Sequence, residues 1–145
     1  MSDTVFRKLN DGISVSPQLD VEDFARARAD GFATVINNRP DGEAADQISS
    51  GDAAEAAAAQ GLAYIHVPVV SGGLTMQDVI VMRDALAGAA KPVLAYCRTG
   101  TRSCNVWALA SAADQPAEEL VDIAARAGYD LSAIKGLLRQ INRAG

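Results

Sequence analysis

Apolar residues along the chain gather in short β-branched runs that alternate with stretches of helical spacing. The runs predict four strands, at residues 13–15, 34–37, 62–67 and 93–96. Capping residues, alanine-rich composition and apolar spacing predict helices at 20–29, about 52–60, after Thr75, about 103–112, and roughly 116–127 and 132–143.

The third predicted helix has the clearest local signals. Thr75 and Asp78 resemble a capping box, with Asp in place of the usual Glu or Gln. Val79, Met82 and Leu86 follow at i, i+3 and i+7, so they share one face of the helix. That face is expected to pack against the sheet.

Strands separated by helices predict an α/β fold with a parallel central sheet flanked by helices on both faces. With 145 residues, the chain is expected to form one domain, residues 1–145. Ligands of such sheets bind beyond the carboxyl ends of the strands. Cys97 directly follows the strand 93–96 and is therefore expected at that edge.

Composition narrows the classes of function. A net charge of −5 makes nucleic acid an improbable main ligand, because phosphate backbones select basic surfaces. No apolar run reaches the ~18 residues of a membrane span, and the first residues resemble no secretion signal, so a cytoplasmic protein is expected. Two cysteines and one histidine predict neither a disulfide framework nor a metal cluster. The oligomeric state is left open.

The segment VLAYCRTGTRSCNVW, residues 93–107, carries the candidate chemistry. A buried strand ends at a thiol, and the next residues are suited to a loop whose N–H groups converge on one spot. The positive end of the following helix and two arginines favour the thiolate and a bound anion. The alternative is an inert core cysteine, which needs no such cationic loop. The predicted catalytic residues are Cys97 and Arg102, and the predicted anion-binding residues are Arg98, Thr99, Gly100, Thr101 and Ser103.

The loop YCRTGTRS resembles the active-site loop of rhodanese-type sulfurtransferases. It also resembles the phosphate loop of protein tyrosine and dual-specificity phosphatases, except that the Arg102-Ser103 pair comes one residue early. With TVINNRPDGE and GLAYIHVPVVSG, nearly the whole chain is similar to the phosphatase-like domains of the beta-lactamase hydrolase-like family. This resemblance implies a dual-specificity-phosphatase scaffold with a loop of rhodanese length. It leaves both phosphate hydrolysis and sulfur transfer open.

Two observations favour sulfur transfer at this stage. The short loop suits one terminal sulfur better than three phosphate oxygens, and residues 70–73, where dual-specificity phosphatases place their acid, contain no carboxylate. The prediction is a rhodanese-type sulfurtransferase without a cofactor, carrying a Cys97 persulfide from a small sulfur-containing anion or persulfide donor to a thiol acceptor. The alternatives are a phosphatase acting through a Cys97 phosphocysteine and a non-catalytic anion-binding or regulatory module. Asp41, Glu43 and Asp46 are the acids that the fold could bring to the loop.

The remaining candidates each have two interpretations. Arg39 and Asp41 either line the pocket or form a pair that holds a turn. Cys104 is a resolving thiol or, more simply, a small residue packed under the loop. His66 is expected to hydrogen-bond the active loop, and Trp107 is expected in the core.

Overall fold

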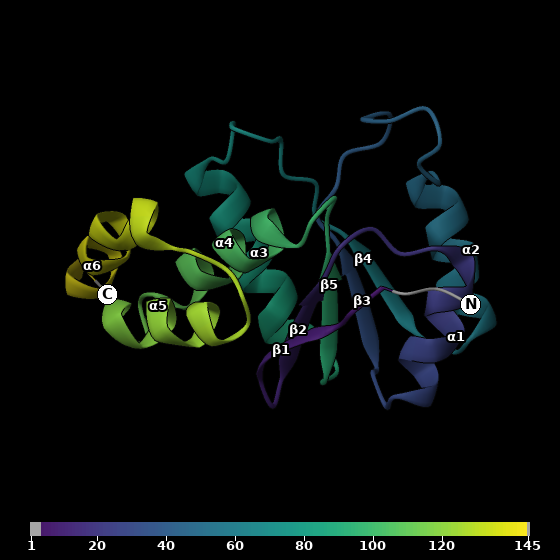
Figure 1. Cartoon of the computed structure of the whole chain (residues 1–145), viewed down its shortest axis with the longest axis horizontal. Coiled ribbons are helices and arrows are strands. Elements are labelled where there is room, and N and C mark those ends of the chain that lie inside the picture. The colour runs from purple at the N-terminus through teal and green to yellow at the C-terminus, as the bar shows by residue number, and fades with distance from the viewer. Residues whose placement is uncertain (1–3, 145) are drawn as a thin grey trace.

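A five-stranded sheet lies between two layers of helices in the computed structural model, which describes residues 4–144 (Figure 1). The strand order is β1-β2-β5-β3-β4, and β2, β5, β3 and β4 are parallel. The strands are β1 Arg7–Asn10, β2 Ile13–Ser16, β3 Thr34–Asn37, β4 Ala63–His66 and β5 Val93–Tyr96.

The helices divide between the two faces, and each face has its own core. One core lies under α1 and α2 and includes Phe24 and Leu94, whereas the other lies under α3 and α4 and includes Met82 and Trp107 (Figure 1). Two further helices, α5 and α6, pack beyond α4. The helices are α1 Val21–Ala29, α2 Ser50–Ala59, α3 Met76–Gly88, α4 Thr101–Ser111, α5 Ala117–Arg126 and α6 Lys135–Ala144, with a 3₁₀ turn, η1 Ser132–Ile134, before α6.

The predicted α/β class and parallel sheet are confirmed, and one strand was missed. β1 pairs with β2 in antiparallel fashion, with Arg7 opposite Val15. Three of the four β1 residues are exposed, because the strand forms an edge of the sheet. An exposed edge strand needs no alternation of apolar and polar residues, so its sequence lacked the usual signal.

The start of α3 follows the predicted capping box. The Thr75 hydroxyl accepts from the Asp78 amide at 3.1 Å, and the Asp78 carboxylate accepts from the Thr75 amide at 3.0 Å. Val79 and Met82 are buried on the face that was predicted to pack inward, and Leu86 is partly buried. No helix within residues 4–144 is long and apolar enough to cross a membrane.

The register of the parallel strands brings their carboxyl ends to one edge. Tyr96, the last residue of β5, lies opposite both Ser16 of β2 and Asn37 of β3, and Asn37 lies opposite His66 of β4. The segments that follow these strands therefore meet, although they are far apart in sequence. This edge holds the predicted site.

Candidate active site

Cys97 leaves the end of β5 and enters a tight turn that leads into α4. Its amide donates to the Ser16 carbonyl at 3.4 Å, and the Gly100 amide donates to the Cys97 Sγ at 3.1 Å. Gly100 has a φ of 94° and caps α4, which begins at Thr101 rather than near 103 as predicted. The left-handed glycine completes the turn early, so Arg102 falls in the first helical turn, where amide N–H groups lack helical partners.

Tyr129 supports this turn from behind. A Cβ on Gly100 would lie 2.1 Å from the Tyr129 hydroxyl oxygen, and that hydroxyl donates to the Thr99 carbonyl at 3.3 Å. Only glycine fits at position 100, because a side chain disfavours a φ of 94° and a Cβ would overlap the Tyr129 hydroxyl. Sequence reasoning missed Tyr129, because nothing in the loop's own pattern points to a residue so far along the chain.

Arg102 is held by a carboxylate from a different loop. Its two terminal nitrogens donate to the two Glu43 oxygens at 2.7 and 2.8 Å, and one of them also donates to the Val69 carbonyl at 2.9 Å. Glu43 accepts from Arg39 Nε at 2.9 Å as well. One carboxylate thus joins two arginines in a charge-assisted network.

The network sets the charge states of its members. Hydrogen bonding to Arg102 lowers the pKa of Glu43 to about 2, although burial acts in the opposite direction, and Arg39 contributes further lowering. The Glu43 carboxylate in turn raises the pKa of Arg102, and Cys97 acts in the same direction. Glu43 is therefore ionised at neutral pH, and Arg102 carries a positive charge next to Cys97.

Of the two interpretations of Arg39 and Asp41, the turn-holding pair does not form, and Arg39 but not Asp41 lines the pocket. Arg39 is buried and donates to Gln18 at 3.0 Å in addition to Glu43. Asp41 instead accepts from the Ser50 amide at 2.7 Å. The unpaired amides at the start of α2 attract this carboxylate, which leaves Glu43 as the partner of Arg39.

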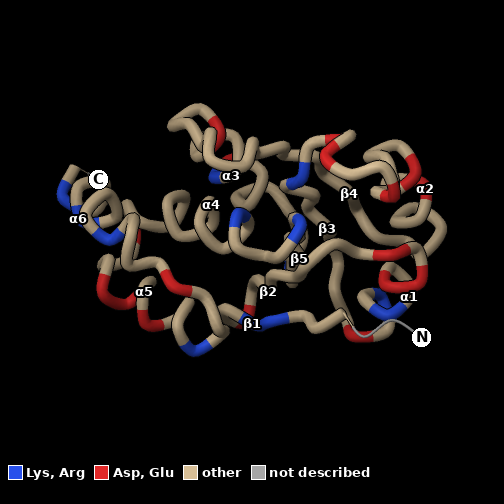
Figure 2. The backbone as a smooth tube through the Cα atoms, turned by 45° about the horizontal axis from the view of Figure 1, so that its top comes forward, with Lys and Arg blue, Asp and Glu red and all other residues tan. Residues whose placement is uncertain are grey.

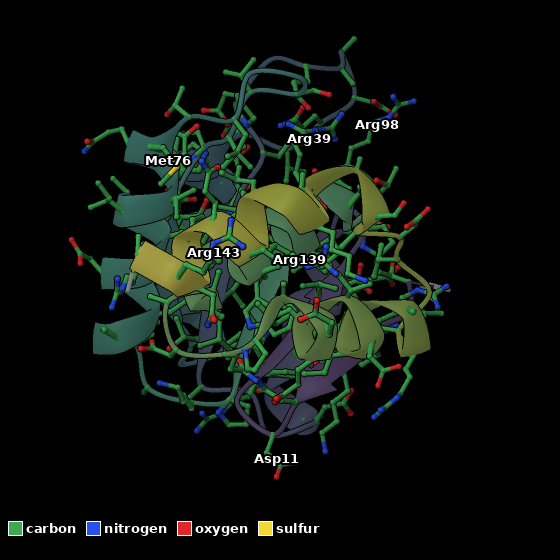
Figure 3. All side chains as sticks on the ribbon, turned by 90° about the vertical axis from the view of Figure 1, so that its left-hand side faces the viewer. Asp11, Arg39, Met76, Arg98, Arg139 and Arg143 are labelled. Atoms are coloured by element: carbon green, nitrogen blue, oxygen red, sulfur yellow. The ribbon has the colours of Figure 1, made fainter. Side chains whose placement is uncertain are left out.

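A pocket of about 430 Å³ lies over the Cys97 turn, with three guanidinium groups and one carboxylate in its wall. Figure 3 shows Arg39 and Arg98 at the same end of the molecule, and Figure 2 shows Asp and Glu spread over α1, α2, α3, α5 and the loop before α2. Excess positive charge in a protein of net charge −5 indicates a site for a small anion. The lining residues are Arg39, Glu43, Ala44, Ser71, Arg98 and Arg102.

Other predicted loop residues take different places. Thr99 and Thr101 are exposed, and their hydroxyl groups are 3.1 Å apart. Ser103 is fully buried, and its hydroxyl has no hydrogen-bond partner among residues 4–144. Cys97 is also fully buried, so its sulfur lies below the surface that the arginines form. Asp41 and Asp46 are absent from the pocket wall, which leaves Glu43 as the acid that reaches it.

Cys104, Trp107 and His66 are structural in this arrangement. Burial raises the pKa of Cys104 to about 12, so it stays a thiol and matches the packing interpretation. Trp107 is 2% exposed and lies in the core as predicted. His66 Nε2 lies 2.9 Å from the Arg39 carbonyl, so the expected bond to the Cys97 loop was wrong. Within the described residues, no three His, Cys, Asp or Glu side chains are placed to hold a metal ion.

Comparison with solved structures places the fold in the class of tyrosine and dual-specificity phosphatases. A candidate phosphatase from Neisseria meningitidis superposes with a TM-score of 0.83 at 33% identity, covering 94% of this chain and 97% of that one. Kinase-associated phosphatase, in a form with its catalytic-site cysteine replaced by serine, gives a TM-score of 0.75 at 14% identity, covering 97% and 94%. The latter likeness concerns the fold alone.

The chain belongs to the family described as beta-lactamase hydrolase-like protein, phosphatase-like domain, whose profile matches residues 5–114. The beta-lactamase hydrolase-like protein of Agrobacterium fabrum is 32% identical over 128 residues, 87% of this chain and 30% of that protein. The protein of the same description from Xylella fastidiosa strain Temecula1 is 34% identical over 136 residues, 91% of this chain and 31% of that protein. This chain therefore spans about a third of the length of these relatives, and the family resemblance drawn from the sequence is confirmed.

Proposed function

We propose that this domain hydrolyses phosphate esters, with Cys97 as the nucleophile. The observation that carries this proposal is the Cys97 sulfur at the N-terminus of α4, hydrogen-bonded by the Gly100 amide, under a pocket lined by three arginines. Backbone N–H groups and guanidinium groups are the partners that phosphoryl oxygens prefer. Membership in a phosphatase-like family and the likeness to phosphatases support this function over sulfur transfer, which the sequence alone had favoured.

The reaction runs in two displacements. The Cys97 thiolate attacks phosphorus, the bond to the ester oxygen breaks, and the alkoxide or phenoxide leaves. Water then attacks the phosphocysteine, loses a proton, and releases inorganic phosphate and the Cys97 thiolate. Arg102 and the amides of the Cys97 turn stabilise the charge that moves onto the equatorial oxygens.

Proton supply to the leaving group defines the preferred substrate. Glu43 is the carboxylate at the pocket, and with a pKa of about 2 it has no proton to donate at neutral pH. Residues 70–73 contain no carboxylate either. The proposed substrates are therefore esters whose leaving group is stable without protonation, such as aryl phosphates, because a phenol ionises near pH ~10 and an alkyl alcohol far above that.

One observation supports sulfur transfer as a second candidate function. Only Arg98, Thr99 and Gly100 separate Cys97 from α4, and such a short turn suits a single terminal sulfur. In that reaction the Cys97 thiolate attacks the sulfane sulfur of a donor such as thiosulfate, and sulfite leaves. A Cys97 persulfide results, and an acceptor thiol, cyanide or sulfite then takes the outer sulfur.

Parallel assays of the same preparation separate the two reactions. We expect hydrolysis of 4-nitrophenyl phosphate that disappears in Cys97→Ser, with little thiocyanate formed from thiosulfate and cyanide. The reverse pattern would assign sulfur transfer instead. Loss of neither activity in Cys97→Ser would remove Cys97 as the nucleophile from both schemes.

A further inference from the structure

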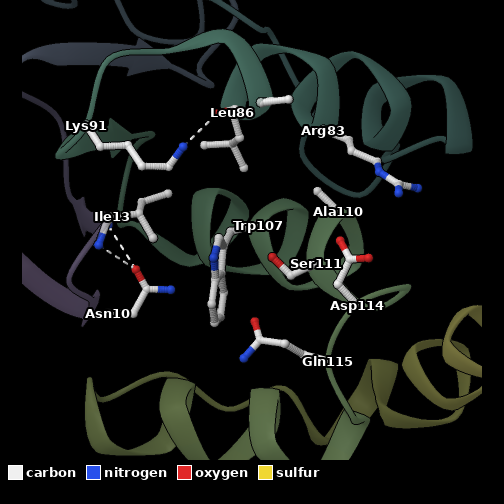
Figure 4. A pocket seen from close by; sticks show the side chains of 12 residues that line it. Asn10, Ile13, Arg83, Leu86, Lys91, Trp107, Ala110, Ser111, Asp114 and Gln115 are labelled. Carbon is white, nitrogen blue, oxygen red and sulfur yellow. Dashed lines mark hydrogen bonds between the residues drawn. The ribbon is translucent and has the colours of Figure 1, made fainter.

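A second pocket, of about 420 Å³, lies near the amino ends of β2 and β5, whereas Cys97 follows the carboxyl end of β5. Figure 4 shows the side chains that line it. It opens where the β1–β2 turn, α3, the segment before β5 and the end of α4 come together. Its volume falls in the range of small-molecule sites. The lining residues are Asn10, Gly12, Ile13, Arg83, Leu86, Ala87, Lys91, Trp107, Ala110, Ser111, Asp114 and Gln115.

The inner wall of this second pocket is apolar. Ile13 and Trp107 are buried, and Leu86 is partly buried against the same core. Figure 4 shows the Trp107 ring in the middle of the pocket, between Ile13 on one side and Ala110 on the other. Leu86 and the exposed Ala87 keep apolar surface above this buried layer, so an apolar ligand body that contacts them removes that surface from water.

The polar groups at the Asn10 and Lys91 side of this wall are donors, whereas Ser111, Asp114 and Gln115 at the other side also carry acceptor oxygens. The Asn10 side-chain oxygen Oδ1 already accepts from the Gly12 and Ile13 amides at 2.8 and 3.1 Å, so the side-chain group left for a ligand is the NH₂. Lys91 donates one N–H to the Leu86 carbonyl at 3.2 Å and keeps two more.

Charge at this second pocket is predominantly positive. Arg83 and Lys91 both line it, and neither forms an ion pair within the described part of the chain. Asp114 is the carboxylate in the wall. A ligand bound beside Lys91 and the Asn10 side-chain amide therefore needs acceptor oxygens.

We propose that this second pocket binds a small organic carboxylate with an apolar body about the size of a benzene ring. The carboxylate lies against Lys91 and the Asn10 side-chain amide, and the apolar body lies against Leu86 and Ala87, above the buried Trp107. This site is independent of the proposed phosphatase activity, because the Cys97 pocket shares none of its lining residues.

The test uses benzoate as the probe and Trp107 as the reporter, since the chain has a single tryptophan. We expect a saturable fluorescence change with benzoate, much weaker binding of the neutral benzyl alcohol, and no binding of inorganic phosphate by this signal. Lys91→Gln should weaken benzoate binding about tenfold, as expected for loss of a charged hydrogen bond. Arg143→Gln, which removes an exposed positive charge on α6, is the matched control and should leave binding unchanged.

The same titration contains the results that would overturn the proposal. Binding of benzylamine more tightly than benzoate would show that Asp114 governs the pocket. A benzoate signal that is absent, or that Lys91→Gln leaves untouched, would also overturn it. Cys97→Ser must bind benzoate normally, and loss of the signal in Arg102→Gln would place the benzoate in the Cys97 pocket instead.

Discussion

Replacing Glu43 with glutamine tests the network that joins the two arginine-bearing segments. Glutamine keeps one acceptor oxygen, but it cannot neutralise two guanidinium groups. Arg102 would lose its bidentate partner, and Arg39, which is 5% exposed, would be left beside Gln18 alone. We therefore expect Glu43→Gln to reduce both folding stability and the precision with which Arg102 faces Cys97.

The pKa of Glu43 gives the size of the effect. Lowering this pKa from 4.5 to about 2 corresponds to about 3 kcal/mol of folded-state stability at neutral pH. The Glu43 side chain is 23% exposed, so solvent screening makes this an upper value. Because the folded pKa is the lower one, the contribution is complete above about pH 5 and is lost as pH falls from 4.5 toward 2.

Urea unfolding of wild type and Glu43→Gln, at pH 7 and again near pH 2.5, measures this contribution directly. We expect the variant to be less stable by about 1–3 kcal/mol at pH 7 and the gap to shrink strongly at the lower pH. Glu118→Gln, which removes an exposed partner of Arg139, is the control and should differ little from wild type at either pH. Equal stability of Glu43→Gln and wild type at pH 7, or a gap independent of pH, would refute the reasoning.

Three further substitutions address the Cys97 turn. Gly100→Ala should lower the free energy of unfolding by about 1–3 kcal/mol and abolish most turnover, because the new Cβ overlaps Tyr129 and a φ of 94° is strained for alanine. The control is Gly136→Ala, where a Cβ has open space, and its thermal melt should match that of wild type. Tyr129→Phe should lower kcat more than it changes KM in steady-state kinetics, since it removes the hydrogen bond to the Thr99 carbonyl without touching the pocket wall; an unchanged kcat would contradict that role. Cys104→Ser should keep most of the phosphatase turnover, because burial holds the pKa of Cys104 at about 12 and the thiol takes no part in the chemistry; a loss equal to that of Cys97→Ser would make Cys104 part of the mechanism.

The sequence predicted the parallel strands and the turn that holds Cys97 at the end of β5 because both depend on local patterns. The β-branched runs predict strands, the capping residues predict helix starts, and Gly100 predicts a turn after Cys97, each from a few neighbouring positions. The edge strand Arg7–Asn10 lacked such a signal, because an exposed polar strand is stabilised by its partner β2 rather than by its own sequence. The start of α4 was predicted two residues late for a related reason, since Gly100 ends the turn in a left-handed conformation.

The arrangement around Arg102 was harder to predict because it depends on contacts distant in sequence. Glu43 was one of three acids considered, together with Asp41 and Asp46. Which of the three reaches Arg102 depends on the path of the loop before α2. The preference for sulfur transfer rested on loop length and on the missing acid, which are properties of the motif rather than of the whole fold. The phosphatase-like family and fold favour phosphate chemistry instead. The missing acid is then accounted for by the proposal of a leaving group that needs no proton.

Rapid acid quenching during turnover, followed by intact-mass measurement, tests the central claim most directly. With excess 4-nitrophenyl phosphate, wild-type protein should carry one phosphoryl group, peptide mapping should place it on Cys97, and Cys97→Ser should carry none. Treatment with thiosulfate should leave the mass of the wild-type protein unchanged. One added sulfur on Cys97 after thiosulfate, without any phosphoryl adduct under turnover, would contradict the phosphatase account and establish the persulfide chemistry in its place.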